Sequence, residues 1–181
     1  MPRALILVAD GSEEIEFVTP YDGFEIQSVG VSLNNENYAH MTRNIRIVPD
    51  YAKLSSVPSP ESYDILILPG GASGAKTFST TNEVTQLIAS FRSQAQKLAT
   101  SSKTESAATR RAKVTSHPSV MEDIKMEGWE YREERVVVDG KVITSRGPGT
   151  AMLFALTIVE TLVGKEKRDE ISGPLMVAQT L

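Results

Sequence analysis

The chain has 181 residues, of which 40% are hydrophobic and 23% charged, and its formal net charge is −4. These values are typical of an ordinary globular protein of one domain, and the negative charge gives no support for nucleic acid or an anionic membrane as a partner. The absence of cysteine excludes disulfides, thiolate metal sites and a cysteine nucleophile. The only histidines are His40 and His117, with no carboxylates at a zinc-ligand spacing, so we expect no metal site.

No apolar run approaches the roughly 20 residues that span a membrane, and no signal peptide precedes Pro2. We therefore expect a cytoplasmic protein that contacts no membrane. The nucleus and the mitochondrion are alternative compartments that the sequence does not separate from the cytoplasm.

The first predicted element is a buried strand over residues 4–9, followed by a tight turn at Gly11 and a helix that starts near Ser12. Glu13, Glu14 and Glu16 lie in the first helical turn, where the helix N-terminus favours negative charge. By itself this pattern is also that of a solvated, charged first turn. The predicted helix has about ten residues before Gly23, which is shorter than the dozen or more that a parallel crossover usually needs.

Further strands are predicted at residues 25–33, 45–48, 64–68, 113–116 and 135–144. Residues 65–68 are continuously apolar and end at Pro69-Gly70-Gly71, which is typical of a strand buried on both faces. Asp139-Gly140 lies between two β-rich arms and predicts a hairpin. Residues 150–162 are apolar nearly all round and predict a buried helix that ends at Gly164. Strands that alternate with helices predict an α/β fold with a doubly wound, mostly parallel sheet.

Residues 93–112 break this alternation. They are polar and poor in β-branched apolar residues, at the place where the plan requires another buried strand. We therefore expect a loop or disorder here, within a single domain over residues 1–181, and the loss of a central strand. Such a strand contributes about four buried aliphatic side chains at about 1.5–3 kcal/mol each, so its loss rivals the stability of a whole domain.

Each motif is weak when taken singly. Gly70 to Gly74 is glycine-rich, but Ala75 separates Gly74 from Lys76, so this is not a P-loop, and no ribose-binding acid is placed for a dinucleotide. A generic nucleotide-binding module therefore remains a distant alternative. His117 before Pro118 has the ordinary interpretation of a structural histidine, and residues 145–150 that of a strand-to-helix turn.

Together and in order, four segments resemble the DJ-1/PfpI superfamily: Ala9-Asp-Gly-Ser-Glu-Glu-Ile-Glu16, Leu68-Pro-Gly-Gly71, Thr115-Ser-His-Pro118 and Ser145-Arg-Gly-Pro-Gly-Thr150. The most similar branch is the eukaryotic one whose members act as glyoxalase III, also called D-lactate dehydratase. The resemblance covers about residues 4–93 and 113–165. It implies a flavodoxin-like sandwich, usually a homodimer, that converts methylglyoxal to D-lactate without glutathione, metal or organic cofactor.

The resemblance also implies roles for particular residues. The family uses a cysteine at a strand-to-helix elbow, activated by a protonated glutamate that matches Glu16 and assisted by a histidine that matches His117. Gly70 and Gly71 match the turn that offers a backbone N–H to the developing oxyanion. The candidates for the pocket rim and the dimer edge are Arg43, beside the first-turn acids, and the Arg146-Gly-Pro148 turn, with solvated charge and a helix-entry turn as the alternative interpretations.

The sequence departs from the family at the elbow. Leu98-Ala-Thr-Ser-Ser102 stands where the family has an apolar strand and its cysteine. A hydroxyl of Thr100, Ser101 or Ser102 is a weak nucleophile unless a base removes its proton. We therefore expect a chain that is inactive or impaired as an enzyme. The alternatives are a non-catalytic binding or chaperone-like protein, and a product that folds poorly because altered splicing or an imperfect gene model has removed coding segments.

Overall fold

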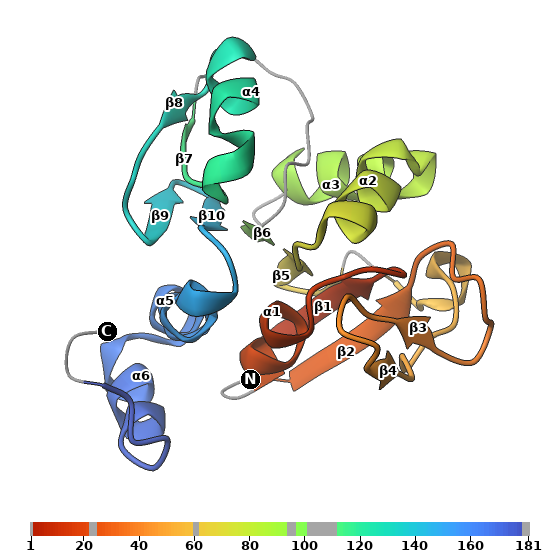
Figure 1. The fold of residues 1–181 in the computed structure, drawn as a ribbon. Helices are drawn as coiled ribbons and strands as arrows, with labels where there is room; N and C mark the ends of the chain where they lie inside the picture. Colours follow the sequence, from red (N-terminus) through yellow and green to blue (C-terminus); the bar gives the residue numbers. More distant parts are fainter. Residues whose placement is uncertain (1, 22–24, 60–61, 94–96, 101–111, 179–181) are drawn as a thin grey trace.

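The computed structural model describes residues 2–21, 25–59, 62–93 and 112–178, together with the backbone of 97–100. Its centre is a six-stranded sheet of order β2-β1-β5-β6-β10-β9 (Figure 1). Neighbouring strands pair in parallel except for β9 and β10, which are antiparallel. The strands are β1 (Arg3–Val8), β2 (Glu25–Gly30), β5 (Ile65–Leu68), β6 (Lys97–Thr100), β9 (Val136–Asp139) and β10 (Val142–Ser145). This order confirms the predicted doubly wound α/β fold.

The predicted loss of the central strand is wrong for residues 97–100. They form β6, which pairs in parallel with β5 on one side and with β10 on the other. The physical reason is that both neighbours are central strands whose backbone N–H and C=O groups need partners, and this requirement outweighs the low strand propensity of the segment. The other residues of the polar segment, 94–96 and 101–111, lie outside the described residues.

Two apolar layers cover the sheet because successive side chains of a strand point to opposite faces. Ile6 and Ile67 pack with Phe17 and Phe154 on one face. Leu7 packs with Phe78 and Ile88 on the other face. The first face is covered by α1 (Glu14–Val18), α5 (Ala151–Val163) and the short hairpin of β3 (Ala39–His40) and β4 (Arg46–Ile47), and the second by α2 (Ala72–Thr80) and α3 (Asn82–Ser93). The core is therefore a three-layer sandwich.

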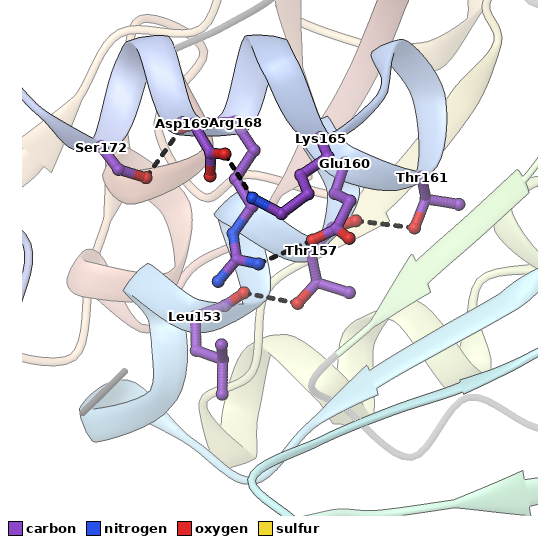
Figure 2. Close-up of polar contacts among 8 residues, drawn as sticks. All are labelled: Leu153, Thr157, Glu160, Thr161, Lys165, Arg168, Asp169 and Ser172. Atoms are coloured by element: carbon purple, nitrogen blue, oxygen red, sulfur yellow. Dashed lines mark hydrogen bonds and ion pairs between the residues drawn. The ribbon is translucent and has the colours of Figure 1, made fainter. Parts of the chain in front are cut away.

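The remaining elements lie at the ends of this sandwich. A small parallel pair, β7 (Lys113–Val114) and β8 (Glu130–Tyr131), flanks α4 (Met121–Met126) beside β9 and β10 (Figure 1). Gly164 ends α5 with φ of +102°, as predicted, and α6 (Lys165–Ser172) follows it at once. Arg168 of α6 pairs with Glu160 of α5 at 2.7 Å (Figure 2), so the two helices are joined by charge as well as by packing.

The first helix begins two residues later than predicted. Ser12 is fully buried, and its hydroxyl accepts a hydrogen bond from the Ala9 N–H at 3.1 Å, so it closes the turn after β1. Glu13 is the N-cap instead, because its carboxylate accepts the Glu16 N–H at 3.0 Å. Only five residues of α1 and the 3₁₀ turn η1 (Thr19–Tyr21) follow, so the helical part of this crossover is short, as expected. None of the helices within the described ranges is long and apolar enough to cross a bilayer.

Candidate functional site

The candidate site is a cavity of about 550 Å³ at the carboxyl edge of the sheet. The turns that follow β1, β5 and β10 meet there, together with the 3₁₀ turn η4 (Pro118–Val120) that follows β7. In a parallel sheet these ends lie side by side, which explains how segments far apart in the sequence form one site. The sequence-predicted residues that line it are Glu16, Arg43, Gly70, Gly71, His117 and Pro148.

Glu16 is the buried acid of the cavity, with only 4% of its surface exposed. Its Oε2 accepts the backbone N–H of Gly70 at 2.5 Å. In return the Gly70 carbonyl accepts the N–H of Glu13 at 2.9 Å. These two bonds join the start of α1 to the turn after β5. The Gly70 N–H is therefore held by Glu16 and is not the donor that the oxyanion role requires.

Gly71 is the remaining amide donor of this turn. Its N–H makes no hydrogen bond to any part of the chain that the structure describes. Its φ is +95°, and a Cβ added to it would overlap the Gly11 carbonyl oxygen and lie 2.9 Å from the Glu13 nitrogen. Only glycine fits such a position. The predicted oxyanion role is thus compatible with the geometry of Gly71 but not with that of Gly70.

His117 and Glu16 line the same cavity and both lie close to Gly147. A Cβ built on Gly147 would lie 3.6 Å from His117 Cδ2 and 4.0 Å from Glu16 Oε1. Ser119, which the sequence analysis did not identify, lies 2.8 Å from His117 Nδ1 through its hydroxyl. A serine two residues after a histidine, with proline between them, is the local signal for such a contact.

Arg146 does not line the cavity. Its guanidinium donates to the Glu133 carbonyl at 2.8 Å and thereby fixes the loop before β9. Pro148 begins the 3₁₀ turn η5 (Pro148–Thr150) and does border the cavity. Among the described residues, no group of three or more His, Cys, Asp or Glu is placed to hold a metal ion.

Arg43 borders the cavity, and its backbone is held there by Glu14. Its backbone N–H donates to the buried carboxylate of Glu14, and the Thr42 hydroxyl donates to the same group at 2.5 Å. Burial by itself raises the pKa of Glu14, but these hydrogen bonds and the charge of Arg43 outweigh burial, so the pKa lies below its ordinary value of 4.5. Glu14 therefore anchors the loop that carries Arg43.

This contact predicts acid sensitivity. A carboxyl group with a lowered pKa in the folded state stabilises the fold above its unfolded pKa, and the contribution disappears as the pH falls through the folded pKa. Glu14→Gln is therefore expected to lower the free energy of unfolding by about 1.5–3 kcal/mol at pH 7, with the difference shrinking below pH 4.5. Urea unfolding across pH measures this, with exposed Glu36→Gln as the control. A difference that stays constant from pH 7 to pH 3 would contradict it.

A buried hydroxyl lies behind His117. Thr115 is 3% exposed, and its Oγ1 has no hydrogen-bond partner in the described part of the chain, whereas its N–H donates to Thr144 Oγ1 at 2.9 Å. Thr115→Val is therefore expected to raise the free energy of unfolding by about 1 kcal/mol. Thr144→Val is the matched control and should lower it by about 1–3 kcal/mol, since it leaves a buried N–H without its acceptor. Thermal or urea unfolding of the two variants shows whether each substitution raises or lowers the free energy of unfolding.

A second group of cavities lies on the outer side of the turn after β1, with volumes of about 260 and 660 Å³. Both are lined by Asp10, Asn34 and His40. The Asp10 carboxylate accepts the backbone N–H of Asn34 at 2.9 Å and that of His40 at 2.8 Å. Asp10 therefore fixes the segments at Asn34 and His40 beside the turn after β1. The spacing of these residues in the sequence does not reveal this role.

Comparisons with known proteins identify the family. A glutathione-independent glyoxalase DJ-1 of Schizosaccharomyces pombe is 35% identical over 187 aligned positions, which cover 94% of this chain and 96% of that protein. Because 187 exceeds the 181 residues of this chain, the relative carries residues that this chain lacks. A Parkinson disease protein 7 homolog of Danio rerio is 35% identical and covers 97% of each chain.

The solved structures give the same result. A Schizosaccharomyces pombe DJ-1 T114V mutant superposes with a TM-score of 0.86 at 31% identity, covering 98% of this chain and all of that one. Drosophila melanogaster DJ-1beta superposes with a TM-score of 0.86 at 32% identity, covering 98% of both. The DJ-1/PfpI family profile matches residues 2–161. With its fold, its sequence and its motifs in agreement, the chain belongs to the DJ-1/PfpI family.

Proposed function

We propose that this chain is a glyoxalase-type DJ-1 protein whose site keeps the acid, the imidazole and the amide donor but has no nucleophile. The observation that carries the proposal is one cavity lined by Glu16, Gly71 and His117 in a chain without cysteine. The ligand class is a small reactive aldehyde such as methylglyoxal. We propose that the chain binds such an aldehyde without converting it to D-lactate.

The chemistry of the family explains why the sulfur matters. A thiolate adds to the aldehyde carbon and forms a thiohemiacetal, while an amide donor stabilises the oxygen and the acid and imidazole move protons. Without the thiolate, Gly71 and His117 retain groups that can polarise a carbonyl, but no bond forms on carbon. Thr100 ends β6, and Ser101 and Ser102 lie outside the described residues.

The test is the assay that defines the activity. Purified protein is incubated with methylglyoxal in the absence of glutathione, and both methylglyoxal loss and D-lactate formation are followed against a buffer blank. We expect no D-lactate above the blank. Saturable quenching of the single tryptophan or a thermal shift with methylglyoxal would support binding, whereas steady D-lactate formation would overturn the proposal.

We further propose a cytoplasmic homodimer. The support is a set of exposed apolar side chains on the sheet face that carries α1 and the β3–β4 hairpin: Ile15, Val18, Tyr21, Ile45 and Val48. Val48 is 76% exposed, which is costly for a valine in water. Light scattering on the same preparation gives the mass, and a monomer at tens of micromolar would contradict the dimer.

We also propose that coding segments are missing in the first crossover and between Phe91 and Val114, and the residues that the Schizosaccharomyces pombe relative has in addition support this. Sequencing the transcript across the codons for Phe91 to Val114 tests this. Uninterrupted reads that encode the present segment as the dominant message would remove the idea.

A further inference from the structure

The two edges of the His117 ring face different surroundings. On one edge, Nδ1 lies 2.8 Å from Ser119 Oγ and 3.3 Å from the Ser119 backbone nitrogen. On the other edge, Cδ2, which is bonded to Nε2, lies 3.6 Å from the position that a Cβ on Gly147 would take, and Glu16 Oε1 lies 4.0 Å from the same position. The ring is exposed overall, so these contacts and not burial determine its orientation.

The contact with Ser119 determines where the ring proton lies. A backbone N–H is only a donor, so an Nδ1 that receives it must be the unprotonated nitrogen. In a neutral imidazole the proton is then on Nε2. The Ser119 hydroxyl, which can rotate, adds a second donor to the same nitrogen at the shorter distance. Pro118 stands at the start of the 3₁₀ turn, and its fixed φ places Ser119 over the ring edge.

We propose that Ser119 is a positioning residue that holds neutral His117 as the Nε2–H tautomer, so that the ring presents a hydrogen-bond donor to a carbonyl oxygen in the cavity. The ligand class rests on the proposed function, but the tautomer does not. Together with the Gly71 N–H, the ring makes the cavity a site with two neutral donors, suited to a carbonyl oxygen.

The same tautomer opposes a catalytic role for a neighbouring hydroxyl. A base that activates serine or threonine must receive the proton on an unprotonated ring nitrogen, and in this tautomer Nε2 already carries a proton while Nδ1 is held by Ser119. For His117 to act as that base, the proton would have to move from Nε2 to Nδ1. Nδ1–H and the Ser119 N–H would then be two donors facing each other without an acceptor. The contact that orients the ring therefore disfavours general-base catalysis.

The tautomer can be read directly by nuclear magnetic resonance. Long-range ¹H–¹⁵N correlation at a pH about two units above the ordinary histidine value of about 6.5 shows which ring nitrogen is protonated. Only two histidines are present, so His40→Gln assigns the signals without ambiguity. We expect a protonated Nε2 and an unprotonated Nδ1 for His117. A protonated Nδ1 would overturn the proposal.

Ser119→Ala removes the hydroxyl and leaves only the longer backbone contact. We expect the ratio of the two His117 tautomers to shift about fivefold toward Nδ1–H, the effect of one ordinary hydrogen bond, and Ser119→Thr to restore the parent ratio. Ser79→Ala, on the exposed side of α2, is the matched control, and unchanged His40 signals show that the fold is kept. An unchanged ratio in Ser119→Ala would overturn the role of Ser119. Both measurements are made without aldehyde, so their outcome is independent of the methylglyoxal assay.

Discussion

Replacing Gly71 with alanine is expected to lower the free energy of unfolding by about 2–5 kcal/mol. The φ of +95° costs an L-residue about 1–2 kcal/mol. A Cβ that overlaps the Gly11 carbonyl oxygen must in addition push apart two backbone segments, which costs about 1–3 kcal/mol or more. Against a total stability of about 5–15 kcal/mol, this single methyl group endangers the fold.

Two other glycines separate these causes. Gly140 has φ of +60° and nothing within 4 Å of the position that an added methyl group would take, so Gly140→Ala should cost only the strain of about 1–2 kcal/mol. Gly149 has neither a positive φ nor a close neighbour, so Gly149→Ala should change stability by less than about 0.5 kcal/mol. Urea unfolding of the three variants gives the order. A Gly71→Ala protein as stable as Gly149→Ala would show that the turn after β5 lies elsewhere.

The second large effect concerns turnover. We expect the conversion of methylglyoxal to D-lactate to be at least about 10⁴-fold slower than in a cysteine-containing relative, a barrier difference of about 5.5 kcal/mol or more. The reason is that a general acid and a donor each contribute about 10²–10⁴-fold only to a step that a nucleophile has begun. Stopped assays for D-lactate over hours measure a deficit of this size.

The variants Glu16→Gln and His117→Ala distinguish a true absence of chemistry from catalysis by a hydroxyl. If no nucleophile acts, both variants should give the same residual rate as the parent. If Thr100, Ser101 or Ser102 attacked the aldehyde with His117 as base, His117→Ala would lower the rate by about 10²–10⁴-fold. Such a drop would contradict the proposed function.

Local sequence was sufficient for the strongly apolar elements. The continuous apolar run of β5, the Asp139-Gly140 hairpin and the nearly all-apolar α5 were each predicted close to their observed bounds. In these segments, burial and turn chemistry act in the same direction as the local pattern. The family motifs likewise singled out Glu16, Gly71 and His117, which the structure brings to one cavity.

Local sequence failed where a partner determines the outcome. The residues of β6 have a poor strand pattern and become a strand because β5 and β10 lie on either side of them. Ser12 resembles an N-cap, yet its hydroxyl closes the preceding turn and Glu13 takes the cap. In both cases hydrogen bonds that only the assembled sheet provides outweigh local propensity.

The chemistry that is available was determined by composition: a chain without cysteine has no thiolate wherever its loops lie. The tertiary structure alone decided how the remaining groups divide their work. The Gly70 N–H is held by Glu16, the Gly71 N–H has no acceptor in the described ranges of the chain, and Arg146 does not line the cavity. The Gly70–Glu16 bond joins residues 54 apart and the Arg146–Glu133 bond joins residues 13 apart. No local pattern encodes such contacts, because a hydrogen bond requires atoms within about 3 Å of each other.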